Sequence, residues 1–317
     1  MYRVLALRLV LATLLAGAVA SAQQTAAPAS QEPRTQPAFR GGVDVVSLNV
    51  TAVDGTNRYV TDLEQAEIAV FEDGVKQEVT FFSRRPRPIA LSLLLDSSAS
   101  MERNMPMLHA AATNFVRRLK PSDLAQVVDF DSRVEIRQGF TSSQTDLESA
   151  IQSTSAGGST ALHNAIYIAL RELDKIRPTA DEDVRRQALV VFSDGEDTSS
   201  LVSFEEVMNL AKRTATAIYT IALRAPEPNS SRGFREAEFV LRTMAQETGG
   251  RAFFPNKIED LAGTYAQIAD ELASQYTIGY TSTNPRHDGA WRKVMLRVTR
   301  PSITARSKNG YFAPTGR

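Results

Sequence analysis

Cysteine is absent from this chain of 317 residues. Its absence excludes a disulfide framework, a thiolate metal site, a cysteine nucleophile and a lipid anchor attached through an acylated cysteine. The stability of the fold must therefore come from packing, with help from any metal that the protein binds.

An excess of one charge is also missing, because 36 basic residues balance 36 acidic residues. No basic stripe with interleaved aromatic side chains occurs, so we predict no nucleic-acid partner. Histidine is scarce, and His109, His163 and His287 lack the spacing of a zinc site. A serine hydrolase is not indicated either, since the chain contains no Gly-x-Ser-x-Gly elbow.

The N-terminus carries an apolar stretch, Leu9 to Ala20, which follows the basic residues Arg3 and Arg8 and ends in a small-residue Ala-Ser-Ala sequence. This pattern predicts a signal peptide over residues 1–22, cleaved after Ala22. The protein is then exported, periplasmic or secreted, without a membrane span after cleavage. The alternative is an uncleaved anchor, but the stretch is short for a span.

Composition divides the rest of the chain. Residues 23–40 are rich in Gln, Ala, Pro, Ser and Thr, which indicates a flexible linker. Residues 41–87 read as an N-terminal β module, and residues 275–313 return to β-strands. Because neither part is large enough to be stable alone, we predict that they pair into one small β subdomain.

Two local patterns support the β module. Val46, Leu48 and Val50 alternate with polar residues, which is typical of a half-buried strand. Asp73-Gly74 lies between apolar segments at 67–71 and 77–82 and predicts a hairpin. The C-terminal strands are expected at 276–280, 291–299 and 304–312.

Strands and helices alternate through residues 88–274, the pattern of a doubly wound, mostly parallel sheet with helices on both faces. We therefore predict an α/β domain with a six-stranded sheet. The expected strands lie near 89–95, 124–130, 133–140, 187–193, 217–223 and 250–254. The expected helices lie near 102–119, 144–153, 160–176, 203–214, 233–247 and 258–274.

Oxygen ligands follow the strands of this domain. Asp96, Ser98 and Ser100 come directly after the first strand, Thr160 opens a helix, and Asp194 follows a later strand. Open α/β sheets bind ligands outside the carboxyl ends of their strands. Mg²⁺ prefers about six oxygen ligands, and hydroxyls coordinate it without cancelling its charge. The pattern predicts a metal site, with glycines at 157 and 158 giving the Thr160 loop close approach.

This combination resembles the metal-ion-dependent adhesion site of von Willebrand factor type A (VWA) domains, and all five positions match. The resemblance covers roughly residues 88–275. The flanks resemble exported proteins with the VWA-related acidobacterial domain, in four segments: Val60-Thr61-Asp62-Leu63, Phe71-Glu72-Asp73-Gly74, Tyr276-Thr277-Ile278-Gly279-Tyr280 and Lys308-Asn309-Gly310-Tyr311-Phe312.

The resemblance implies one divalent cation, Mg²⁺ or else Mn²⁺ or Ca²⁺, bound by Asp96, Ser98, Ser100, Thr160 and Asp194. It also implies that the cation captures an Asp or Glu carboxylate of a protein partner at its open position. The interpretation is a binding module of the adhesion type, not an enzyme. Neither the identity of the partner nor the oligomeric state is predicted.

Other interpretations stay open. Ser100 could simply cap a helix that begins near Met101, and Asp194 could belong to an ordinary turn. Asp96 could act as the nucleophile of a Mg²⁺-dependent phosphoryl-transfer enzyme, although Ser98 stands where a second acid is expected. The cation could also be purely structural, with binding elsewhere.

Overall fold

The computed structural model of the protein describes residues 45–85, 87–176, 185–193, 197–223 and 232–315. These residues belong to one compact unit, Val43–Arg317. The predicted signal peptide, the predicted linker and Asp194 lie outside the described residues. Among the described helices, none is long and apolar enough to cross a membrane.

The α/β part is built on a six-stranded sheet with the order β10-β9-β8-β5-β6-β7. Neighbouring strands run parallel except β7, which is antiparallel to β6. The bounds are β5 Ile89–Asp96, β6 Leu124–Phe130, β7 Val134–Thr141, β8 Arg186–Ser193, β9 Ala217–Ala222 and β10 Ala252–Phe253. The predicted fold class is confirmed.

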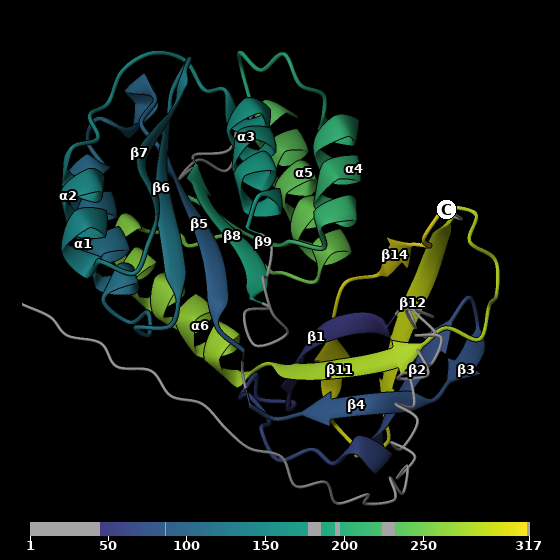
Figure 1. Cartoon of the computed structure of the whole chain (residues 1–317). Coiled ribbons are helices and arrows are strands. Elements are labelled where there is room, and N and C mark those ends of the chain that lie inside the picture. The colour runs from purple at the N-terminus through teal and green to yellow at the C-terminus, as the bar shows by residue number, and fades with distance from the viewer. Residues whose placement is uncertain (1–44, 86, 177–184, 194–196, 224–231, 316–317) are drawn as a thin grey trace, which may run out of the picture. The chain divides into compact units, whose positions relative to one another are not determined.

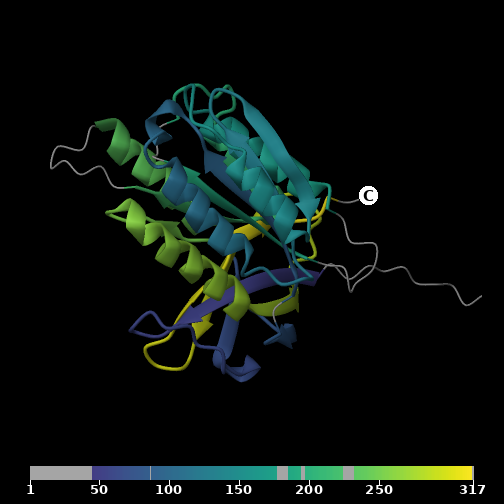
Figure 2. The same ribbon diagram turned by 90° about the vertical axis from the view of Figure 1, so that its left-hand side faces the viewer.

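Helices cover both faces of this sheet (Figures 1 and 2). One face carries α1 Met105–Val116, α2 Gln144–Gln152 and α6 Leu261–Ser274, and the other carries α3 Leu162–Asp174, α4 Phe204–Thr214 and α5 Arg232–Thr248. Side chains of a strand alternate between its two faces. Leu91 and Leu93 of β5 accordingly pack in one core cluster, while Leu94 packs in the other.

The first helix is shorter than the predicted 102–119. A 3-10 helix, η2 Ala99–Met101, follows β5, and α1 begins only at Met105. Pro106 occupies the first turn of α1, where its missing N–H costs no hydrogen bond. The helix ends at Val116, shortly before Pro121, which disfavours helical backbone in the residue before it.

The N- and C-terminal flanks together form two further four-stranded sheets. Their orders are β13-β1-β11-β4 and β14-β12-β2-β3, so each sheet combines strands from both flanks. The bounds are β1 Val45–Val53, β2 Ile68–Glu72, β3 Val75–Gln77, β4 Val79–Ser83, β11 Tyr276–Thr281, β12 Trp291–Val298, β13 Thr304–Arg306 and β14 Gly310–Phe312. Two 3-10 helices, η1 Gln65–Glu67 and η4 Ile258–Asp260, precede β2 and α6. Leu48, Val70, Ile278 and Val294 share one core, which confirms the predicted β subdomain.

Two predicted strands are divided between the sheets. Segment 77–82 divides between β3 and β4, and segment 304–312 divides into β13 and β14. Alternation of apolar and polar residues indicates which face of a strand is buried, but it does not identify the partner strand. The predicted Asp73-Gly74 turn is present, with φ of 47° and 84° at its two central residues, as a tight hairpin turn requires.

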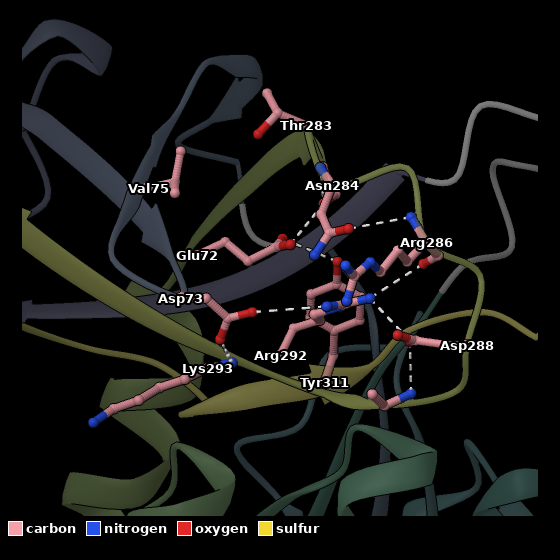
Figure 3. Close-up of polar contacts among 12 residues, drawn as sticks. Glu72, Asp73, Val75, Thr283, Asn284, Arg286, Asp288, Arg292, Lys293 and Tyr311 are labelled. Atoms are coloured by element: carbon pink, nitrogen blue, oxygen red, sulfur yellow. Dashed lines mark hydrogen bonds and ion pairs between the residues drawn. The ribbon is translucent and has the colours of Figure 1, made fainter.

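A polar cluster holds the β subdomain together internally (Figure 3). Glu72 is 2% exposed and accepts hydrogen bonds from the hydroxyls of Tyr280 at 2.9 Å, Ser282 at 2.6 Å and Tyr311 at 3.0 Å. Burial, followed by the Glu72 carboxylate, raises the pKa of Tyr311 to about 12, so its hydroxyl stays a donor. The cluster thus joins β2 of one flank to β11 and β14 of the other.

A second buried network joins the α/β part to the β subdomain. Glu271 of α6 is 0% exposed and accepts a 2.9 Å hydrogen bond from the Tyr219 hydroxyl of β9. The Arg306 guanidinium of β13 and the Thr51 hydroxyl of β1 also donate to it. Burial, and then the Glu271 charge, raises the pKa of Tyr219 well above its ordinary value, so the phenol remains a donor.

Candidate metal centre

Asp96 is the last residue of β5, and it organises the loop that follows. Its side chain is 0% exposed. The Ser98 N–H donates to Asp96 Oδ1 at 2.8 Å, and the Ser193 hydroxyl donates to Asp96 Oδ2 at 2.6 Å. Ser193 ends β8, the strand beside β5, so the carboxylate ties two neighbouring strand ends together. Sequence reasoning missed Ser193, although its place directly before Asp194 at a strand end could have indicated it.

Ser98 and Ser100 present their hydroxyls side by side, with 3.0 Å between the two Oγ atoms. Two neighbouring ligands of an octahedral Mg²⁺ ion with bonds of about 2.1 Å lie about 3.0 Å apart. Neither serine caps α1, whose N-cap is Asn104, and Ser98, the N-cap residue of η2, makes no side-chain capping hydrogen bond. The helix-cap interpretation of Ser100 is therefore wrong, and the paired hydroxyls fit a hard cation.

The loop that carries Thr160 is held against the Ser98 loop by backbone hydrogen bonds. The Gly157 N–H donates to the Ser97 carbonyl at 2.7 Å, and the Ala99 N–H donates to the Gly158 carbonyl at 3.1 Å. Thr160 itself is 5% exposed. The structure thus brings the loops of Asp96, Ser98, Ser100 and Thr160 together.

Only one of the two loop glycines is required sterically. Gly158 has φ of 71°, and an added Cβ would lie 2.8 Å from Asp131 Oδ2. An added Cβ at Gly157 would meet nothing within 4 Å, so Gly157 contributes its N–H rather than its lack of a side chain. A close backbone approach was expected at both glycines, but only at Gly158 would a side chain clash with a neighbour.

The segment after Asp194 is bonded to the Thr160 backbone. The Thr160 N–H donates to the Thr198 hydroxyl at 3.0 Å, and the Thr198 N–H donates to the Thr160 carbonyl at 2.9 Å. Thr198 follows Asp194 in the sequence, so these contacts join the Thr160 loop to the segment that comes after Asp194. Asp194, the remaining predicted ligand, falls outside the described residues.

Carboxylates surround the loops. Asp197 Oδ2 lies 3.3 Å from His163 Nδ1, while its Oδ1 is buried with no partner in the described parts of the chain. Most of the Asp197 side chain is buried, with 18% of it exposed. A polar cavity of about 410 Å³ lies beside Ser97 and Gly158 and is also lined by Asp129 and Asp131. Arg133 and Arg137 line the same cavity, and Arg137 pairs with Asp129 at 2.7 Å, so this cavity carries charges of both signs.

The arrangement argues against phosphoryl transfer by Asp96. A carboxylate nucleophile needs an oxygen that can reach a substrate, yet Asp96 is buried and each of its oxygens accepts a hydrogen bond. Within the described ranges, no group of three or more His, Asp or Glu side chains is placed to hold a metal. A cation at these loops would therefore depend on the hydroxyls of Ser98, Ser100 and Thr160 as well as on carboxylate.

Comparison with known proteins agrees with this architecture. Residues 91–267, more than half of the chain, match the family described as von Willebrand factor type A domain. A curated relative, calcium-activated chloride channel regulator 1 of Bos taurus, is 26% identical over 203 residues, which are 62% of this chain and 20% of that protein. The chain thus spans about a fifth of that relative's length.

Two solved structures share the fold. One is von Willebrand factor type A from Catenulispora acidiphila, with a TM-score of 0.50 and 11% identity over 87% of this chain and 76% of that chain. The other is proximal thread matrix protein 1 from the mussel byssus, with a TM-score of 0.50 and 16% identity over 60% of this chain and 49% of that chain. At these identities the likeness concerns the fold alone.

Proposed function

The chain belongs to the von Willebrand factor type A domain family, and from this premise we propose that it is an exported binding module that captures an acidic group of a protein partner through a divalent cation. Domains of this family typically mediate adhesion or protein binding, and they generally bind a divalent metal at the adhesion site. Capture of a carboxylate and the individual ligands are proposals for this chain.

The observation that carries the proposal is the pair of serine hydroxyls 3.0 Å apart beside a fully buried aspartate. We propose that Ser98, Ser100 and Thr160 supply neutral oxygens, and that Asp96 and Asp194 hold them in place directly or through water. Mg²⁺ is the proposed cation, with Mn²⁺ or Ca²⁺ as alternatives. When bound, it would supply an electrophilic position at which a partner's Asp or Glu carboxylate replaces water.

Partner capture is expected to depend on the cation. The mature protein, used as bait in the native envelope or secreted fraction, should retain a partner that is lost with chelator, with Thr160→Ala and with Asp194→Ala. Thr145→Ala, which removes the same side chain from an exposed position on α2, should leave capture unchanged. Bound proteins are identified by mass spectrometry, and folding is checked by circular dichroism.

Loss of the same protein under all three conditions would support capture through the cation. Retention through all three, with the bait folded, would place binding elsewhere. If chelator lowers only the melting temperature, the cation has a structural role.

Export is expected to remove the N-terminus. We propose that residues 1–22 are a signal peptide, so N-terminal sequencing of the mature protein should begin at Gln23. An intact Met1 in the membrane fraction would contradict cleavage. We further propose domain boundaries of 23–40 for the linker, 41–87 and 275–313 for the β subdomain and 88–274 for the VWA domain.

A further inference from the structure

A cavity of about 310 Å³ lies at the end of the sheet where β8 and β9 begin, opposite the end that carries the Asp96 loop. Its wall includes the residues that begin β8 and β9, while Asp96 lies at the carboxyl end of β5. Because these strands run parallel, their amino ends lie at the far edge from the candidate metal centre. The opposite wall comes from β1 and β11 of the β subdomain. The cavity is therefore separate from the centre described above.

The charged side chains among the described lining residues of this cavity are all basic. Arg87, Arg185, Arg186 and Lys308 line it, and no acidic residue does so among the lining residues that the structure describes. None of the four forms an ion pair with a carboxylate in the described part of the chain. Positive charges gathered in one cavity repel one another, and they attract an anion.

Arg186 shows how this positive charge is held in place. It is 6% exposed, and its guanidinium donates to neutral acceptors: the Arg87 carbonyl at 2.8 Å, the Leu272 carbonyl at 2.8 Å and Gln275 Oε1 at 2.7 Å. These bonds fix the group without neutralising it. Burial lowers the pKa of Arg186 and the nearby Asp123 carboxylate opposes this only in part, so an anionic ligand would reduce the remaining cost of burying the charge.

A hydroxyl on the opposite wall lacks a partner. Thr277 of β11 lines the cavity, is 2% exposed, and its Oγ1 has no hydrogen-bond partner within the described residues. Asn49 of β1 stands opposite Thr277 in the strand register and lines the same cavity. A buried water could satisfy this hydroxyl alone. Water would leave the basic side chains without a counter-charge, whereas an oxyanion would satisfy both.

Lys308 is sensitive to this environment. Desolvation lowers its pKa from 10.5 to about 8, and no carboxylate opposes the shift. Of the charged groups nearby, Lys212 and Glu247 pair with each other at 3.1 Å. A bound anion would favour the charged form of Lys308.

From the unpaired basic side chains and the unsatisfied Thr277 hydroxyl, we propose that this cavity binds a small organic ligand carrying a phosphate or sulfate ester. Arginine groups match the oxygens of such esters, and lysine adds a compact charge. The cavity has the volume of the smallest ligand pockets, about 300 Å³, which leaves room for an organic part beside the ester. Its preference is opposite to that of the metal centre, which would recognise the partner's carboxylate through a cation.

The proposal is tested by calorimetric titration of the mature protein with glycerol phosphate, inorganic phosphate and sodium sulfate at constant ionic strength. Chelator is present throughout, so the result is independent of the metal centre and of the proposed function. All three compounds should bind in preference to chloride, and the ester should bind most tightly. Equal affinity for ester and bare phosphate would overturn the organic ligand, and no preference over chloride would overturn the site.

Charge-removing variants should confirm the location. Lys308→Met and Arg185→Ala should each weaken glycerol phosphate binding by about ten- to a hundredfold, the range for one lost charge-assisted hydrogen bond. Lys76→Ala, which removes the same charge from an exposed residue of β3, should leave affinity unchanged. An equal loss in all three variants would indicate a general effect of net charge and overturn the proposal.

Thr277→Val separates ligand binding from folding. The substitution removes an unpaired hydroxyl without a change of shape, so the free protein should melt at the same or a higher temperature. Ester affinity should nevertheless fall, because the ligand loses a donor. Unchanged affinity in Thr277→Val and in Lys308→Met would overturn the site.

The pH dependence gives a further readout. Sulfate keeps its charge across the range, so its affinity should be constant below pH 8 and should fall above it as Lys308 loses its proton. Lys308→Met should remove this fall. Constant sulfate affinity from pH 7 to pH 10 in the unsubstituted protein would contradict the role of Lys308.

Discussion

Asp96→Asn should lower the affinity of the mature protein for Mg²⁺ at least about a hundredfold, the upper range for substitutions around metal ligands. The carboxylate is fully buried and accepts hydrogen bonds from the Ser98 N–H and the Ser193 hydroxyl, so it sets the position of the loop as well as adding negative charge. The asparagine keeps the shape and one acceptor oxygen but loses the charge. Calorimetric titration with Mg²⁺, repeated with Mn²⁺, measures the effect.

Ser97→Ala is the matched control for this variant. Ser97 is as buried as Ser98, but its contacts to the neighbouring loops run through its backbone N–H and carbonyl, which alanine retains. Its affinity for Mg²⁺ should be unchanged. Equal Mg²⁺ affinities of Asp96→Asn and the unsubstituted protein, with both folded by circular dichroism, would show that these loops do not bind the metal.

Glu271→Ala should lower the free energy of unfolding by about 3 kcal/mol, because removal of one partner from a buried ion pair leaves the other without compensation. The lower end of the usual range applies, since the Arg306 side chain is 31% exposed and water can reach it. The Tyr219 hydroxyl would lose its acceptor at the same time. Urea denaturation of the mature protein measures the loss.

Asp270→Ala provides the comparison. Asp270 precedes Glu271 on α6 and pairs with Arg118 at 3.0 Å, but both side chains of this pair are about half exposed. Such surface pairs contribute about 0–1 kcal/mol, so this variant should be nearly neutral. Glu271→Gln, which retains an acceptor for Tyr219, should fall between the two. Similar losses of unfolding free energy for Asp270→Ala and Glu271→Ala would show that burial of Glu271 does not increase the contribution of its ion pair to stability.

Much of the fold could be predicted because its signals are local. Buried runs such as Ile89–Asp96 and the helical spacing of apolar residues in Leu162–Asp174 mark strands and helices without knowledge of partners. The start of α1 was harder to predict from the sequence, because the 3-10 turn at Ala99–Met101 arises from the loop's own tertiary contacts. Which sheet each short flanking strand joins is likewise decided by packing between distant segments.

The candidate site was predictable for a related reason. Asp96, Ser98 and Ser100 lie within one loop, so their spacing survives in the sequence, whereas Ser193 becomes a partner of Asp96 only through the pairing of β5 with β8. Glu271 gave no local signal of burial. A glutamate on an amphipathic helix is ordinarily solvated, and here burial depends on Tyr219 and Arg306, which come from other elements.

The pairing of β1 with β11 determines how the molecule carries tension. Val45, where β1 begins, stands opposite Thr281, and Val50 stands opposite Tyr276, the residue by which β11 connects to α6. A pull applied before Val45 and resisted at the VWA domain therefore enters the ladder at one end and leaves it at the other. The load acts in shear along the strands, so the hydrogen bonds of the ladder share it instead of opening one after another.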